Sequence, residues 1–170
     1  MATKLEIHKD FLDFLRLLNQ RDARYLVIGG YAVGFHGYIR ATNDFDVFVE
    51  ISESNAEKLV GVFKKFGFNV PELSEGLFLE PGTIVRVGVP PVRLEVLNEI
   101  SGVTFAECFK KRVVQVIGDV PINFIGRDDL LKNKVASDRD KDRIDVNHLT
   151  KGKAKAKPKP KTTAKRKKKT

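Results

Sequence analysis

One short segment, residues 44–51, restricts the fold of this chain more than any other. Its sequence, DFDVFVEI, has the two-residue period of a β-strand with one face in a core. The residues expected on that apolar face are Phe45, Val47, Val49 and Ile51. Asp44 and Asp46 share the opposite face, although aspartate disfavours strands and two like charges this close repel each other. A divalent cation between the carboxylates would remove this cost, whereas an edge strand facing water would tolerate the acids without one.

The segment before this strand has the features of a phosphate-binding turn. Residues 24–28 (RYLVI) are a short apolar run that predicts a buried strand, and this run stops at Gly29 and Gly30. Residues 31–37 favour a short helix. A double glycine lets the backbone approach a ligand closely, and its N–H groups together with the next helix can bind phosphate, although a simple tight turn has the same sequence. A strand, a glycine turn, a short helix and an acid-bearing strand are what a site for a metal-bound nucleoside triphosphate requires.

The rest of residues 1–150 predicts a mixture of helices and strands. Leucine and phenylalanine at helical spacing indicate an amphipathic helix over residues 5–20, and Ser54 with Glu57 resembles a capping box that begins a helix ending at Gly67. Further strands are expected at residues 83–89, 92–97, 112–117 and 120–125, the last two forming a hairpin across Gly118-Asp119. Further helices are expected near residues 104–110 and, in two pieces, over 128–150. The predicted class is α/β or α+β.

The last twenty residues, 151–170, differ from the rest in composition. They contain 11 Lys and Arg and no acid, whereas residues 1–150 contain 20 basic and 22 acidic residues, so this segment alone makes the net charge +9. Lysine alternates with alanine and proline there, with no large apolar residue to bury, which predicts a disordered tail after a domain of residues 1–150. Such a tail would bind nucleic acid through its phosphates, without sequence specificity, or would serve only solubility.

Several classes of protein are excluded or disfavoured by composition. No apolar run approaches the roughly 20 residues that cross a membrane as a helix, and the N-terminus lacks the pattern of a secretory signal. Cys108 is the only cysteine, which excludes an intramolecular disulfide and a cysteine-rich zinc site. We therefore expect a protein of the reducing cytoplasm without a membrane partner.

Two longer strings resemble a known superfamily. IGGYAVGFHGYIRATNDFDVFV, residues 28–49, resembles the signature of polymerase-β-like nucleotidyltransferases, in which two small residues precede a spacer and an Asp–hydrophobic–Asp/Glu strand. The stretch Arg40–Asp46 looks like that of the small stand-alone branch related to abortive-infection and toxin–antitoxin nucleotidyltransferases. Residues 134–145 (KVASDRDKDRID) resemble the C-terminal helical motif of the same branch.

The resemblance implies a nucleotidyltransferase fold, a mixed β-sheet flanked by helices, with a two-magnesium site. Its catalytic and metal-binding residues would be Asp44, Asp46 and a third carboxylate on a neighbouring strand. Glu95 in the string Arg93-Leu94-Glu95-Val96-Leu97 fits this third place, where the superfamily usually has Asp. The nucleotide-binding residues would be Gly29, Gly30, Arg40, Thr42, Lys134, Arg139 and Asp142, with Asp142 and Asp145 positioning the two cations of the C-terminal motif. Without the resemblance, residues 134–145 are equally well a charged helix with internal ion pairs.

The implied reaction is the transfer of a nucleoside monophosphate from an NTP such as ATP to a hydroxyl of RNA, protein or a small molecule, with release of pyrophosphate. The alternative is a catalytically degenerate module of the same fold that binds nucleotide or nucleic acid. The likeness to the toxin–antitoxin branch also suggests an antitoxin-type protein partner.

Overall fold

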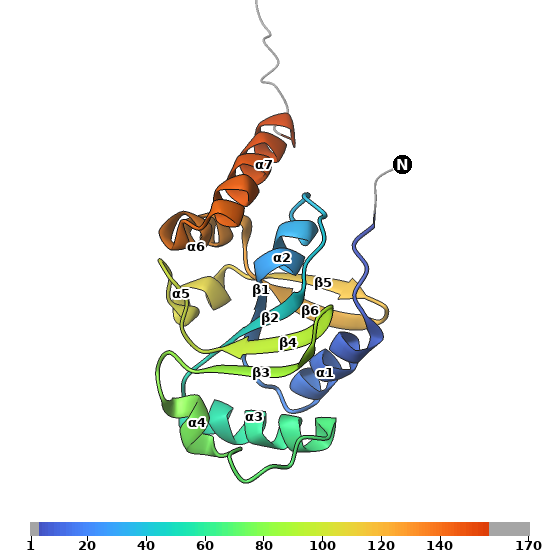
Figure 1. The fold of residues 1–170 in the computed structure, drawn as a ribbon, viewed down its shortest axis with the longest axis vertical. Helices are drawn as coiled ribbons and strands as arrows, with labels where there is room; N and C mark the ends of the chain where they lie inside the picture. The colour runs from blue at the N-terminus through green and yellow to red at the C-terminus, as the bar shows by residue number, and fades with distance from the viewer. Residues whose placement is uncertain (1–3, 157–170) are drawn as a thin grey trace, which may run out of the picture.

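The acid-bearing segment forms β2 (Asp44–Val49), an inner strand of a six-stranded sheet (Figure 1). A computed structural model describes residues 4–156 of the chain. The strand order is β3-β4-β2-β1-β6-β5. The other strands are β1 (Tyr25–Ile28), β3 (Ile84–Val89), β4 (Val92–Leu97), β5 (Val113–Ile117) and β6 (Val120–Phe124). The sheet is mixed, because β2 runs parallel to β4 but antiparallel to β1.

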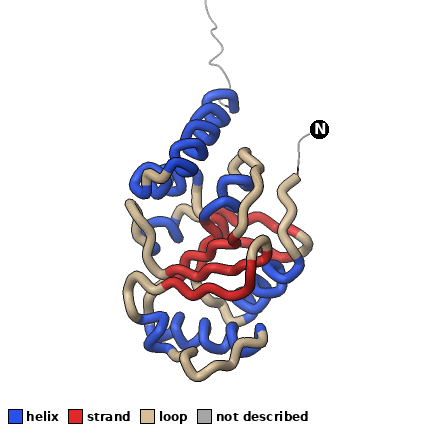
Figure 2. The backbone as a smooth tube through the Cα atoms, viewed as in Figure 1, coloured by secondary structure: helices blue, strands red, loops and turns tan. Residues whose placement is uncertain are grey.

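Helices cover the sheet on both sides, so that the strands lie in the middle of the molecule (Figure 2). In Figure 1, α2, α6 and α7 lie above the sheet, and α1, α3 and α4 lie below it. The helices are α1 (Lys9–Gln20), α2 (Gly29–Phe35), α3 (Glu53–Phe66), α4 (Glu75–Leu79), α5 (Phe105–Lys110), α6 (Arg127–Ser137) and α7 (Asp140–Ala156). The predicted α/β class, a mixed sheet flanked by helices, is therefore confirmed.

Aromatic packing fixes which face of β2 carries the acids. Phe45 is fully buried and stacks on Phe11 of α1, with 4.6 Å between the ring centroids. Since neighbouring residues of a strand point to opposite faces, this contact turns Asp44 and Asp46 to the other side of the sheet. The core below the sheet thus positions the carboxylates above it.

The element bounds differ from the sequence-based expectation at several ends. Helix α1 begins at Lys9 rather than residue 5, after the N-cap His8, and α2 begins at Gly29 rather than residue 31. The expected cap Ser54 lies inside α3, because Ser52 is the N-cap and accepts a hydrogen bond from the backbone N–H of Asn55. The short helix α4 was not expected.

The predicted turn between β5 and β6 and the two predicted C-terminal helices are present, but the last helix is longer than expected. Gly118 and Asp119 both have positive φ, 54° and 62°, in the predicted turn between β5 and β6. The two predicted helical pieces after residue 128 are α6 and α7, separated at Asp138, whose φ is 50°. However, α7 continues to Ala156, past residue 150 where the disordered tail was expected to begin. The remainder of that expected tail, 157–170, lies outside the described residues.

Candidate active site

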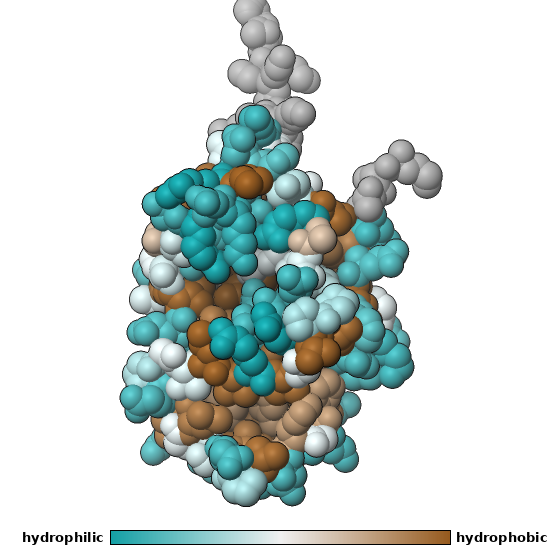
Figure 3. All heavy atoms as spheres, in the orientation of Figure 1, coloured by the Kyte–Doolittle hydropathy of each residue, from teal (hydrophilic) through white to brown (hydrophobic). Residues whose placement is uncertain are grey.

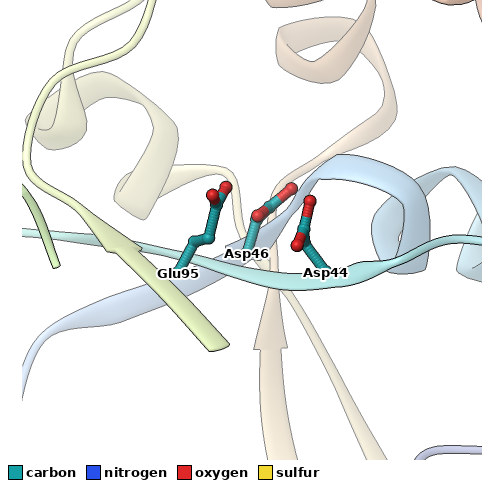
Figure 4. Close-up of side chains that lie close together, drawn as sticks. All are labelled: Asp44, Asp46 and Glu95. Carbon is teal, nitrogen blue, oxygen red and sulfur yellow. The ribbon is translucent and has the colours of Figure 1, made fainter. Parts of the chain in front are cut away.

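Three carboxylates from two adjacent strands meet on the upper face of the sheet. The parallel register of β2 and β4 places Asp46 opposite Glu95. Figure 4 shows Asp44, Asp46 and Glu95 pointing the same way, with Asp46 between the other two. One oxygen from each carboxylate lies within 4.8 Å of the others, a spacing at which the three could hold a metal ion. The sheet therefore brings Glu95 beside the two aspartates, from which it is 49 and 51 residues away in the sequence.

Gly29 is required by the position of Asp46. Its φ is +67°, and a Cβ at this residue would lie 2.2 Å from Asp46 Oδ2. A Cβ on Gly30 would lie 2.7 Å from the hydroxyl oxygen of Thr42. The diglycine therefore packs directly against the acid-bearing strand and the loop before it, a closeness that larger residues would prevent.

Two of the three carboxylates have an arginine partner. Arg93, opposite Asp44 in the register of β2 and β4, donates from Nε to Asp44 Oδ1. Arg86 of β3 is opposite Glu95 and donates from Nε to that carboxylate. The ion pair with Asp44 raises the pKa of Arg93.

Asp46 lacks such a partner. Its Oδ1 is buried and accepts no hydrogen bond from the described residues. Burial, together with the neighbouring Glu95 and Asp44 carboxylates, raises the pKa of Asp46 to about 7. An all-oxygen donor set with a buried, unpartnered carboxylate oxygen fits a hard divalent cation, which would supply the missing positive charge.

A buried ion-pair network forms the wall opposite β3. Lys134 of α6 is 4% exposed, and its Nζ lies 3.0 Å from both Asp142 and Asp145 of α7. Arg40 donates to both oxygens of Asp145, at 2.8 and 2.7 Å, while Arg139 Nε donates to Asp142 at 2.8 Å. Although burial alone would raise it, hydrogen bonds from Arg40 and Lys134 hold the pKa of Asp145 below its usual range. The network joins the loop before β2 to α6 and α7.

The expectation that residues 134–145 form one charged helix with internal ion pairs is therefore wrong. Lys134 lies on α6, whereas its partners, 8 and 11 residues later, lie on α7. These ion pairs therefore join two helices, unlike pairs three or four residues apart within one helix. Asp142 and Asp145 are fully buried behind the pocket wall, so they position cations and do not face the pocket.

A pocket of about 640 Å³ lies over the acids. It contains nine of the residues that the sequence suggested: Gly29, Gly30, Arg40, Thr42, Asp44, Asp46, Glu95, Lys134 and Arg139. Arg86, Arg93 and Lys141 also line it, and no role had been assigned to them from the sequence. The period-2 pattern of residues 83–89 and 92–97 would have aligned Arg86 with Glu95 only if the hairpin register were known. Figure 3 shows hydrophilic residues gathered over α6 and α7 at the upper end of the described part.

None of the helices within residues 4–156 combines the length and apolar character needed to cross a membrane.

A solved structure has a fold similar to that of this chain. The chain matches the crystal structure of an antigenic nucleotidyltransferase-like protein from Paracoccidioides brasiliensis with a TM-score of 0.52 and 17% identity, over 89% of this chain and 79% of that one. Among curated protein sequences, none matches this chain. At the family level, residues 5–150 match the family described as nucleotidyltransferase of unknown function (DUF6036). The chain thus belongs to this nucleotidyltransferase family, in agreement with the superfamily that its glycine and aspartate motif resembles.

Proposed function

We propose that this protein is a magnesium-dependent nucleotidyltransferase that moves a nucleoside monophosphate from an NTP to a hydroxyl acceptor. The observation that carries the proposal is the buried, unpartnered oxygen of Asp46 at the centre of three converging carboxylates. Clustered acids cost stability, and a binding module would gain little from keeping one of them without a counter-charge.

Asp44, Asp46 and Glu95 would hold two Mg²⁺ ions. Bound there, the metal would lower the pKa of the acceptor hydroxyl and neutralise charge on the phosphates. Glu95 would accept the hydroxyl proton. The acceptor oxygen would bond to the α-phosphorus as the bond to the bridging oxygen of pyrophosphate breaks, and pyrophosphate would leave.

The remaining pocket residues would bind and orient the triphosphate. Gly29 and Gly30 would donate backbone N–H groups to its terminal oxygens, a contact that their lack of side chains permits. Arg139, with 61% of its side chain exposed, would pair with the phosphates, while Arg40, Thr42 and Lys134 would hold the wall in place. Asp142 would act behind the wall by orienting Arg139.

Metal-dependent labelling tests this function directly. The protein is incubated with each α-³²P-labelled NTP, Mg²⁺ or Mn²⁺, and RNA, protein and small-molecule acceptors. We expect transfer that requires the metal and falls at least 100-fold in Asp44→Asn and Asp46→Asn. Glu57→Gln, an exposed change on α3, serves as the control. Full activity in both Asp variants would show that the assigned site is wrong. The absence of both transfer and Mg²⁺–NTP binding in the wild-type protein would rule out the proposed enzymatic function.

A second candidate is a degenerate module that binds nucleotide without transfer. It is favoured by Glu95 in place of the usual Asp and by Arg86 and Arg93, which already neutralise two of the carboxylates. Mg²⁺–NTP binding without transfer to any acceptor, in wild type and in Glu95→Asp alike, would support this candidate. Transfer gained by Glu95→Asp would instead indicate an active site that lost its usual third acid.

Two partners complete the proposal. Nucleic acid would bind the lysine-rich residues 151–170 without sequence specificity. The likeness of residues 40–46 and 134–145 to the toxin–antitoxin branch leads us to propose an antitoxin-type protein partner, for which co-purification with the product of the neighbouring gene is the test.

A further inference from the structure

Arg86 and Arg93 form a second cationic wall of the pocket, distinct from the wall of α6 and α7. Both line the pocket beside the acids, and Arg86 lies on β3, an edge strand of the sheet. The side chain of Arg86 is 56% exposed and that of Arg93 is 32% exposed, so both guanidinium groups are accessible to a ligand. The proposed nucleotide contacts make no use of either residue.

The register of four strands fixes where this wall stands relative to the diglycine. Arg86 pairs with Glu95, Glu95 with Asp46, and Asp46 with Ile28, the residue before Gly29. These positions form one row across β3, β4, β2 and β1, about 14 Å long at the usual strand spacing. Arg86 and Gly29 therefore stand at opposite ends of the row, with the carboxylates between them.

Because the displacement is in line, the donor nucleotide and the acceptor would lie at opposite ends of this row. The attacking oxygen and the leaving oxygen lie on opposite sides of the transferred phosphorus. If the pyrophosphate leaves at the diglycine end, as the proposed function requires, the acceptor hydroxyl approaches from the β4–β3 end. It then lies beside Glu95 and within the reach of the Arg86 and Arg93 side chains.

The donors of this wall suit an anion on the acceptor. Each guanidinium uses its Nε in the carboxylate pair, and among the described residues the terminal nitrogens of both make no hydrogen bond. A metal bound by Asp44 and Glu95 would also compete with both arginines for these carboxylates. A fork of N–H donors without a partner matches the paired oxygens of a phosphate.

We infer that Arg86 and Arg93 form the acceptor site and select an acceptor that carries a phosphate ester close to its reacting hydroxyl. This inference rests on the proposed function. The phosphate ester belongs either to the end of a nucleic-acid strand or to a small phosphorylated sugar. Because no strand of the described sheet lies beyond β3, the acceptor can extend past this edge. A neutral hydroxyl would leave the terminal nitrogens of both arginines without a partner.

Calorimetric titration of the full chain tests the acceptor site without turnover. The protein is first saturated with Mg²⁺ and the α,β-methylene analogue of an NTP, all four bases being tried, and is then titrated with ribose 5-phosphate or ribose. We expect ribose 5-phosphate to bind and ribose not to bind. Arg86→Gln and Arg93→Gln should each weaken ribose 5-phosphate binding at least tenfold, with Arg86→Lys in between, because lysine keeps the charge but lacks the fork.

The control variant is Arg143→Gln, which removes the same charge from an exposed position of α7 outside the pocket. It should bind ribose 5-phosphate like wild type, and each variant is saturated with Mg²⁺ and the nucleotide analogue before the titration. A second arm titrates a short single-stranded RNA with a free 3′-hydroxyl into the same set of variants. Stronger dependence on Arg86 and Arg93 for the RNA than for ribose 5-phosphate would identify the strand end as the source of the phosphate, and the reverse would identify the sugar.

The possible failures are distinguishable. Equal binding of ribose 5-phosphate and of the RNA by wild type, Arg86→Gln and Arg93→Gln, or the failure of both ligands to bind the nucleotide-loaded protein, would overturn the acceptor site and leave the proposed function standing. Failure of every nucleotide analogue to bind with Mg²⁺ would overturn the proposed function, and the acceptor site with it.

Discussion

At the scale of single residues, the site is built from side chains that are unfavourable where they lie. Asp46 is half-buried beside two other carboxylates, with its Oδ1 fully buried, and Gly29 has a positive φ at a place where a Cβ would collide with Asp46. Such positions cost stability and persist in functional sites, where the cost serves binding or catalysis. Substitutions of Asp46 and of Gly29 test these two costs separately.

Replacement of Asp46 by asparagine should stabilise the metal-free protein at neutral pH. The pKa of Asp46 is raised from 3.8 to about 7, so the folded state keeps a proton that the unfolded state releases. Its contribution to stability therefore falls as the pH rises from about 4 to 7 and stays low above. In urea titrations without metal, we expect Asp46→Asn to gain about 1–3 kcal/mol at pH 8 and little at pH 4. A loss at pH 8 would contradict the burial of this charge.

Replacement of Gly29 by alanine should damage both stability and metal binding. Gly118 provides a matched control, because its φ of +54° is similar but an added Cβ would meet only Leu12 at 3.4 Å. We expect Gly118→Ala to cost about 1 kcal/mol for the backbone alone. Gly29→Ala should cost more and should weaken Mn²⁺ binding at least tenfold, measured by electron paramagnetic resonance. Equal effects of the two substitutions would show that Asp46 does not depend on Gly29.

At the scale of elements, the sequence predicts the strands better than the contacts between them. The alternation of residues 44–49 and 92–97 predicts β2 and β4, because each has one face in the core. Helix α4 has only five residues, too few for a helical period to stand out. The superfamily motif predicts the three carboxylates Asp44, Asp46 and Glu95. Their partners Arg86 and Arg93 can be identified only from the registers of β2, β3 and β4, which one sequence does not reveal.

The junction of α6 and α7 should depend on Lys134. Its ammonium lies between Asp142 and Asp145, and removing one partner from a buried ion pair leaves an uncompensated charge. We expect Lys134→Met to lower the free energy of unfolding by about 3 kcal/mol or more. Lys132→Met, an exposed change on the same helix, should have little effect in the same urea titrations. Similar midpoints for both variants would rule out a structural role for the network.

At the scale of the whole molecule, the candidate site and the excess positive charge lie in different parts of the chain. The acids and the pocket belong to residues 28–141, while all of the excess positive charge follows residue 150. Helix α7 extends to Ala156, so the end of this helix, and not residue 150, is the place to divide the two parts experimentally. The sequence composition could not reveal this, because lysine and alanine favour helices as well as polar tails.

Ending the chain after Ala156 should remove nucleic-acid affinity and leave the pocket intact. We expect Mg²⁺–NTP binding within about twofold of the full chain, since the described residues that line the pocket lie between Ile28 and Lys141 and are all retained. Binding to a labelled RNA, followed by fluorescence anisotropy between 50 and 200 mM salt, should become weaker and less steeply dependent on salt. RNA affinity that is unchanged by the truncation would place nucleic-acid binding in the folded domain.

The row from Arg86 to Gly29 also bears on how the chain reaches its native state. Its members come from two distant parts of the sequence, residues 28–46 and residues 86–95, and lie side by side only when β1, β2, β3 and β4 have all paired. Nucleotide bound along the row would hold these segments against local opening together. Amide hydrogen exchange should therefore slow in all four strands at the same ligand concentration, as a single cooperative unit, and the pocket should be absent from every partly folded form that lacks the β3–β4 hairpin.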